Sequence, residues 1–142
     1  MLTIQRLSYE DAAILISGAE AKAQEIGIQM CIAVVDESGF LIAFKRMDHS
    51  KALSTTLAQD KAFTAAISKK PTADYNAAAV PGNLTNGIQS AVGGRFSTVG
   101  GGVPVMIDDA VVGAIGLSGG AAEQDMACAA AGVALFLKET GA

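Results

Sequence analysis

The amino-acid sequence predicts an α+β domain in which helices cover both faces of one antiparallel sheet, an α/β/α sandwich. Segments with helical and strand periodicity occur in the order helix, two strands, helices, two or three strands, helix. Turn sequences join consecutive strands directly, so neighbouring strands are expected to run antiparallel. The chain has 142 residues, of which 51% are hydrophobic and 17% charged, so it can bury one core. We therefore expect a single domain over residues 1–142.

The first predicted helix has a signal at each end. Ser8 is suited to cap its N-terminus, and Glu10 and Asp11 place negative charge in the first turn, where it stabilises the helix dipole. Apolar residues then recur at helical spacing as far as Ile26, and Gly27 supplies the stop. One face of this helix is therefore expected to lie on the sheet or on another helix.

Two predicted strands follow, Gln29–Val35 and Phe40–Arg46. Both are rich in residues that favour strands, and the Asp36-Glu37-Ser38-Gly39 segment between them is typical of a turn. The two strands are expected to form an antiparallel hairpin, after which the chain leaves the sheet at Arg46–Ser50.

The segment from Ala52 to Lys69 is predicted to be the second helix, with a stripe of alanines suited to close packing and Pro71 at its end. The next segment, Thr72–Phe96, contains repeated Pro and Gly residues and indicates short helical turns and loops. An irregular segment of this length inside a compact domain commonly forms the wall or lid of a functional site.

The remaining strands lie in or just before the glycine-rich segment Gly100–Asp125. Strands are expected at Val103–Ile107 and Val111–Leu117, joined by an Asp-Asp turn. With Ser97–Val99 as a short edge strand, the sheet is expected to have about five strands.

The last helix is expected at Ala121–Lys138. Its apolar stripe consists of Met126, Ala129, Ala130, Val133 and Leu137. Two glycine clusters, Gly100–Gly102 and Gly119-Gly120, flank the second hairpin. Because glycine has no Cβ, these clusters indicate backbone that lies close to another surface, either a ligand or a neighbouring subunit.

Charge and hydropathy argue against two classes of partner. The net charge is −4 and no basic run exceeds two residues, so nucleic acid is not an expected partner. No apolar run approaches the roughly 20 residues of a membrane span, so no membrane partner is expected either. The first residues lack a signal-peptide pattern, and both cysteines lie in apolar contexts typical of reduced thiols. The expected location is therefore the cytoplasm, and no metal site is predicted apart from a haem iron.

Several segments resemble the GlcG/HbpS-like family, the haem-degrading or domain-of-unknown-function 336 group that includes the C-terminal domain of PduO. Val34–Gly39 and Phe44–Asp48 resemble its "VVD-x-G-G … F-x-R-M-D" signature, and Lys61–Ala66 is similar to its "K-A-x-T-A" helix. Gly101–Pro104 and Gly113–Gly120 resemble its "G-G-x-P" and "G-A-I-G-V-S-G" blocks. The blocks occur in order and cover nearly the whole chain.

This resemblance implies a profilin-like fold and assembly into dimers or larger homo-oligomers. It also implies that the protein binds haem or a corrinoid and belongs to a catabolic operon. The chain departs from the family pattern at two positions. Ser38 replaces the first of two glycines, and His49 stands where glycine or a small residue is more usual. The second departure places the only histidine of the chain beside the signature.

The leading hypothesis is a small-molecule binding protein whose ligand is haem, another tetrapyrrole or a small acidic metabolite. His49 can ligate haem iron, although a lone histidine at a strand exit is commonly a plain surface residue. Arg46 can grip a carboxylate or haem propionate, or form a structural ion pair. Met47 can ligate haem iron, but it is better suited to filling the core. The expected ligand-binding residues are Arg46, Met47, Asp48, His49, Lys61, Gly101, Gly102, Pro104, Gly119 and Gly120.

Two alternative hypotheses remain open. An enzyme of isomerase or lyase type would move a proton on a small metabolite carrying a carboxylate, with Lys61, His49 or Asp125 as acid or base. Lys61 lies on the small-residue face of its helix and would need a partner there, so a structural salt bridge is its other interpretation. A structural assembly module is the third hypothesis, because alanine-rich helices and glycine-rich strands suit contacts between subunits.

Overall fold

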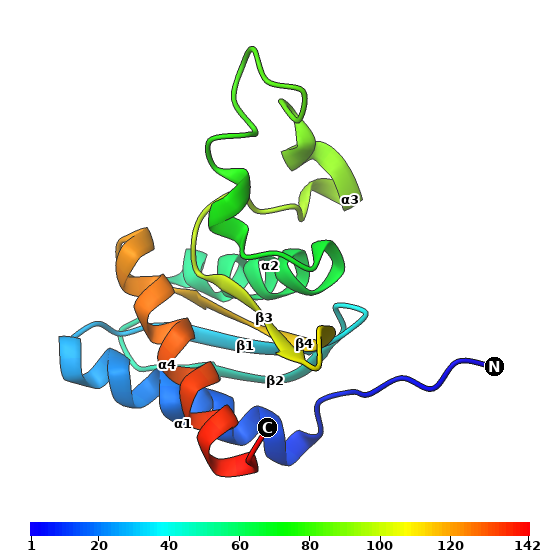
Figure 1. Ribbon diagram of the computed structural model, residues 1–142. Coiled ribbons are helices and arrows are strands. Elements are labelled where there is room, and N and C mark those ends of the chain that lie inside the picture. Colours follow the sequence, from blue (N-terminus) through cyan, green and yellow to red (C-terminus); the bar gives the residue numbers. More distant parts are fainter.

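The computed structural model describes residues 1–142 as a four-stranded antiparallel sheet with helices on both faces. On one face, α1 (Tyr9–Ile26) and α4 (Ala122–Thr140) lie side by side, and α2 (Ala52–Ser68) covers the other face (Figure 1). The predicted α/β/α sandwich is confirmed.

The sheet has the order β2-β1-β4-β3, so β1 and β4 are central and β2 and β3 are its edges. The strands are β1 (Cys31–Asp36), β2 (Leu41–Arg46), β3 (Gly102–Ile107) and β4 (Ala110–Ser118). Every residue of β1 is buried, whereas β2 is half-buried or exposed along its length. Pro104 is accommodated in β3 because an edge strand tolerates the loss of a backbone donor.

The fifth strand that the sequence predicts at Ser97–Val99 is absent. Side chains bind the backbone of this segment instead: Thr64 Oγ1 accepts from Ser97 N at 2.9 Å, and Thr72 Oγ1 donates to Val99 O at 2.6 Å. These bonds satisfy backbone groups that a strand would pair with a neighbour, so the sheet ends at β3.

The predicted ends of α1 are confirmed. Ser8 and Asp11 form a reciprocal capping box, in which Ser8 Oγ accepts from Asp11 N at 3.1 Å and Asp11 Oδ2 accepts from Ser8 N at 2.8 Å. Gly27 closes the helix in the left-handed conformation, with φ of 74°. Two backbone donors at the start of the helix are thereby satisfied locally.

The apolar stripe predicted for α4 is buried only in part: Ala129 is buried, and Val133 and Leu137 are half-buried against the core. Met126 and Ala130 are exposed, and the buried residues are Asp125, Cys128, Ala129, Gly132 and Phe136. Two close contacts orient the helix. Asp125 pairs with a lysine of α2, and Gly132 packs so closely on α1 that a Cβ there would lie 2.6 Å from the Leu15 carbonyl oxygen. These contacts help to determine which face of α4 is buried.

The irregular segment after α2 forms an arm that projects from the α2 side of the sheet (Figure 1). It contains three short helical elements, η1 (Thr72–Tyr75), η2 (Ile88–Ser90) and α3 (Ala91–Gly94). At its base the Tyr75 and Phe96 rings pack edge to face, with centroids 4.9 Å apart. The predicted loops and turns are confirmed.

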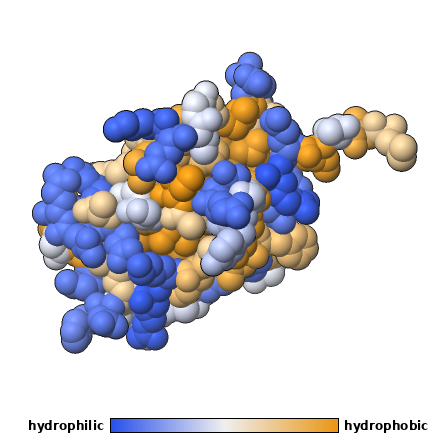
Figure 2. Space-filling model, turned by 90° about the horizontal axis from the view of Figure 1, so that it is seen from below, coloured by the Kyte–Doolittle hydropathy of each residue, from blue (hydrophilic) through white to orange (hydrophobic).

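The face formed by α1 and α4 is mainly hydrophilic, with smaller hydrophobic areas between the polar side chains (Figure 2). The N-terminal segment extends away from the body, and its Met1, Leu2 and Ile4 side chains are exposed. No helix of the structure is both long and apolar enough to span a membrane.

Candidate functional site

The family signature ends in a tight turn at the end of β2. Ser50 closes this turn on Met47, whose carbonyl oxygen accepts from Ser50 N at 3.2 Å and from Ser50 Oγ at 2.7 Å. Asp48 and His49 form the exposed tip. His49 has φ of 68°, in the left-handed region that favours glycine, so the turn itself explains why a glycine suits this position.

The structure brings Arg46, Met47, Asp48 and His49 together around one shallow cavity of about 500 Å³. Its other lining residues are Glu20, Gln24, Gln29 and Lys45. Lys45 is paired with Glu20, whereas the exposed Arg46 guanidinium has no ion pair. The Met47 sulfur accepts from Met30 N at 3.3 Å, so it faces the core. The cavity thus presents a free imidazole and a free guanidinium.

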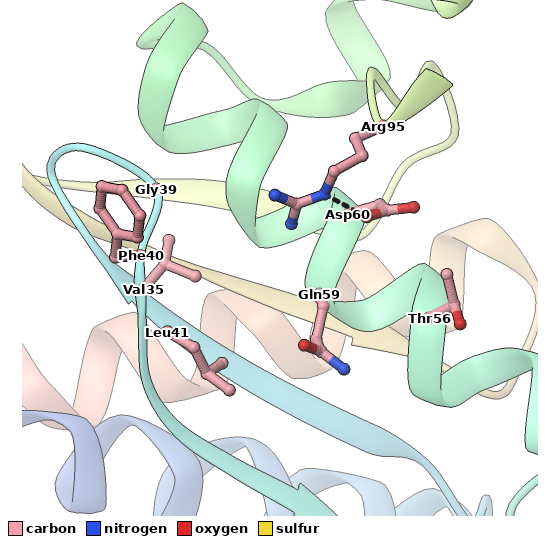
Figure 3. Close-up of a pocket in the computed structure, with 8 residues that line it drawn as sticks. All are labelled: Val35, Gly39, Phe40, Leu41, Thr56, Gln59, Asp60 and Arg95. Carbon is pink, nitrogen blue, oxygen red and sulfur yellow. Dashed lines mark hydrogen bonds and ion pairs between the residues drawn. The ribbon is translucent and has the colours of Figure 1, made fainter. Parts of the chain in front are cut away.

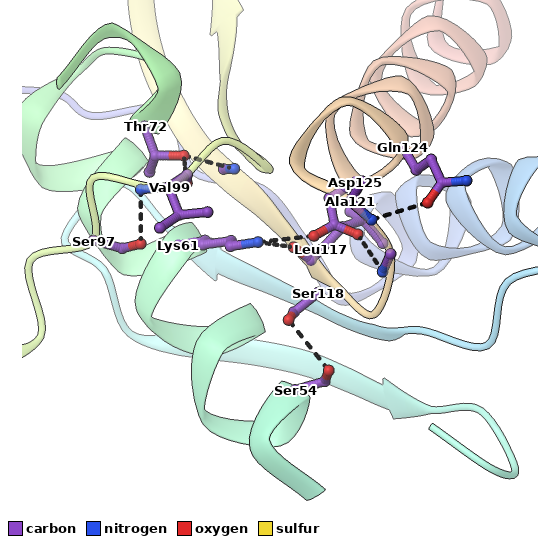
Figure 4. Close-up of polar contacts among 12 residues, drawn as sticks. Ser54, Lys61, Thr72, Ser97, Val99, Leu117, Ser118, Ala121, Gln124 and Asp125 are labelled. Atoms are coloured by element: carbon purple, nitrogen blue, oxygen red, sulfur yellow. Dashed lines mark hydrogen bonds and ion pairs between the residues drawn. The ribbon is translucent and has the colours of Figure 1, made fainter. Parts of the chain in front are cut away.

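Lys61 and Asp125 lie elsewhere, in a buried ion pair between α2 and α4 (Figure 4). Their side chains are 2% and 3% exposed, and Lys61 Nζ lies 2.9 Å from Asp125 Oδ2. Nζ also donates to Leu117 O at 3.0 Å, and Asp125 Oδ1 accepts from Gly120 N at 2.9 Å. Neither residue lines a cavity. The salt bridge that was one interpretation of Lys61 is present.

The glycine clusters pack against the chain itself. A Cβ on Gly102 would lie 2.3 Å from Lys61 O, and one on Gly101 would lie 3.0 Å from Lys61 Nζ. A Cβ on Gly119 would lie 2.4 Å from Gln29 O, and one on Gly120 would lie 2.6 Å from the Gln124 side-chain oxygen. The structure does not bring these glycines, or the buried Pro104, to the cavity at the end of β2.

The β1–β2 turn is held by charged groups. Asp36 Oδ1 accepts from Ser38 N at 2.9 Å and from Phe40 N at 3.0 Å, as the turn sequence predicts. Arg6 binds Glu37 with two nitrogens, its Nε lying 2.8 Å from Glu37 Oε2. These hydrogen bonds lower the pKa of Glu37 to about 2 and raise the pKa of Arg6 above its usual value.

A second cavity, of about 400 Å³, lies at this turn and was missed by the sequence reasoning (Figure 3). Its polar wall contains Arg95, whose Nε donates to Asp60 Oδ1 at 3.0 Å and whose guanidinium lies 3.9 Å from the centre of the Phe63 ring. The available signal was Arg95 itself, the first charged residue after Asp74. Nothing in the sequence shows that Asp60 lies beside it.

The chain matches known proteins over most of its length. The model of the family "Haem degrading protein HbpS-like" matches residues 7–134. An uncharacterized 15.0 kDa protein of the dhaT-dhaS intergenic region of Citrobacter freundii is 34% identical over 86% of both chains. The corrinoid adenosyltransferase PduO of C. freundii is 33% identical over 90% of this chain, which spans 38% of PduO.

Solved structures agree with these relatives. The Klebsiella pneumoniae protein ORFY superposes with a TM-score of 0.94 at 32% identity, covering 96% of this chain and 94% of ORFY. The PduOC–haem complex superposes with a TM-score of 0.88, also at 32% identity, covering 92% and 94% of the two chains. Both the sequence blocks and the fold therefore assign this chain to the haem degrading protein HbpS-like family.

Proposed function

We propose that this chain binds haem or a related tetrapyrrole as a small-molecule binding protein of a catabolic operon. The observation that carries the proposal is the likeness to the PduOC–haem complex, which extends over nearly the whole chain. The similarity to a corrinoid adenosyltransferase supports the same class of ligand, and the relative encoded between dhaT and dhaS supports the operon setting.

The cavity at the end of β2 has the donor chemistry that a haem requires. Haem iron is ligated in proteins by His, Cys, Met or Tyr. Among the residues that line this cavity, only Met47 and His49 carry such a donor atom, and the Met47 sulfur is engaged by the core whereas His49 is exposed. We propose His49 as the iron ligand and Arg46 as the partner of a propionate.

The polar lining of this cavity is relevant to whether the protein binds haem as a monomer or as a homo-oligomer. Met47 is the only hydrophobic residue among the eight that line it, so the cavity by itself offers little apolar cover to a porphyrin face. We propose that the protein is a homo-oligomer in the haem-bound form, with a second copy covering the other face of the ring.

Titration with haemin tests this proposal. The expected result is a Soret band shifted from that of free haemin, with an imidazole-type spectrum. His49→Ala should remove that spectral type, and Arg46→Gln should weaken binding about tenfold because one charge-assisted contact is lost. Arg95→Gln, in the other cavity, is the matched control and should bind as the wild type does. An unshifted Soret band overturns haem binding, and an unchanged His49→Ala spectrum overturns the ligand assignment.

A further inference from the structure

We infer that the cavity between the β1–β2 turn and α2 binds a small organic acid with an apolar body. Its volume of about 400 Å³ lies within the range of small-ligand pockets. One wall of the cavity is apolar. The other wall is polar and contains a single arginine, Arg95. The lining residues are Val35, Gly39, Phe40, Leu41, Thr56, Gln59, Asp60 and Arg95.

Arg95 is held in place from both its backbone and its side chain. Its carbonyl oxygen accepts from Thr64 Oγ1 at 3.1 Å, and its Nε donates to Asp60 Oδ1 at 3.0 Å. The guanidinium stacks over the Phe63 ring. Its two terminal nitrogens have no hydrogen-bond partner in the chain, and they lie toward the β1–β2 turn across the cavity (Figure 3). Two parallel N–H donors on a fixed plane match a carboxylate.

The charge of the site selects a monoanion. Asp60 is close enough to neutralise Arg95 in the empty site, and a second carboxylate added to this pair leaves a single net negative charge. Because the Arg95–Asp60 pair is neutral overall, a doubly charged phosphate would leave two uncompensated negative charges at the site, where a carboxylate leaves one. The Arg95 fork is therefore suited to one carboxylate.

The opposite wall of the cavity is suited to a ligand with an apolar body. Phe40 and Leu41 are 73% and 51% exposed, although both are large hydrophobic residues, and they stand on the cavity beside Val35. A ligand that covers them removes apolar surface from water. Between the two walls, Gln59 donates its amide nitrogen to Thr55 O at 2.9 Å, which leaves its amide oxygen free to accept from a hydroxyl on the ligand.

This cavity is separate from the proposed haem site. Arg46–His49 follow one end of β2 and Phe40 and Leu41 lie at the other, so the two sites are about 17 Å apart along the strand. Loss of binding at one site is therefore not expected to abolish binding at the other.

Fluorine NMR with 4-fluorobenzoate and its neutral analogue 4-fluorobenzamide tests the inference on the full chain. We expect the benzoate to bind and the benzamide to bind at least tenfold more weakly. In proton–nitrogen spectra of the protein, the benzoate should shift the backbone amides of Phe40, Leu41 and Gln59. Arg95→Gln should weaken benzoate binding at least tenfold, since a bidentate charge-assisted contact is lost. Arg95→Lys keeps the charge without the fork and should weaken it several-fold.

Two further variants sharpen the test. Asp60→Asn keeps an oxygen that accepts from Arg95 Nε but removes the negative charge, so it should tighten benzoate binding several-fold. Lys138→Gln, which removes an exposed positive charge outside both cavities, is the control and should leave benzoate binding unchanged. The inference is overturned if benzoate does not bind at millimolar concentration, if both probes bind equally, or if Arg95→Gln and Arg95→Lys bind as the wild type does.

Discussion

Replacing Lys61 with methionine should strongly destabilise the fold. The substitution leaves the Asp125 carboxylate buried with one remaining hydrogen bond, from Gly120 N. Breaking a buried ion pair from one side costs about 3–5 kcal/mol, because the other charge stays out of water without its partner. For a domain of this size, we expect the melting temperature to fall by about 10 °C. Equilibrium urea unfolding measures the loss, with the exposed Lys51→Met as the control.

The double variant Lys61→Met with Asp125→Asn separates the ion pair from simple packing. Asparagine keeps an oxygen that can accept from Gly120 N, but it no longer needs a cation. We expect the double variant to lose about 2 kcal/mol, less than Lys61→Met alone, because no buried charge is left unpaired. If the double variant is no more stable than Lys61→Met, the destabilisation does not come from an orphaned charge and our account of the pair is wrong.

Three other features give measurable expectations. His49→Gly should stabilise the protein by about 1 kcal/mol in urea unfolding, since it relieves the left-handed backbone at φ of 68°; a loss of stability would count against this. Gly116→Ala should cost about 3 kcal/mol, because its Cβ would lie 2.2 Å from a carbonyl oxygen of α2, and a neutral result would refute such close packing. The Glu37 carboxyl should titrate by NMR near pH 2, and Arg6→Ala should bring the midpoint back toward 4.5. Because folding lowers this pKa, its stabilising contribution is present above pH 4.5 and disappears as the pH falls toward 2.

The parts of the fold that were predicted correctly depend on contacts between residues close in sequence. Ser8 caps α1 through Asp11, three residues on, and Asp36 orders its own turn through the backbone nitrogens of Ser38 and Phe40. Such contacts can be recognised in a short window because both partners are visible at once. The order of the helices and strands, together with the turns between consecutive strands, then predicted the layers of the sandwich, and the family blocks agreed with that order.

The features that the sequence reasoning missed depend on partners far apart in the chain. The missing fifth strand results from Thr64 binding Ser97, 33 residues away. The buried face of α4 is set partly by Asp125 binding Lys61, 64 residues away. The Arg95 cavity likewise requires Asp60, 35 residues earlier. No periodicity marks these pairs, because each consists of single polar side chains that meet only when the layers pack.

The Lys61–Asp125 pair also has a consequence for the order in which the protein matures during synthesis. Lys61 leaves the ribosome well before Asp125, and until α4 follows, the ammonium group of Lys61 has no carboxylate with which to enter the interior. A buried charge without a partner is so costly that the emerging sheet and α2 must remain open to water at this point. We therefore expect the two sides of the sheet to close around Lys61 only after α4 has been made.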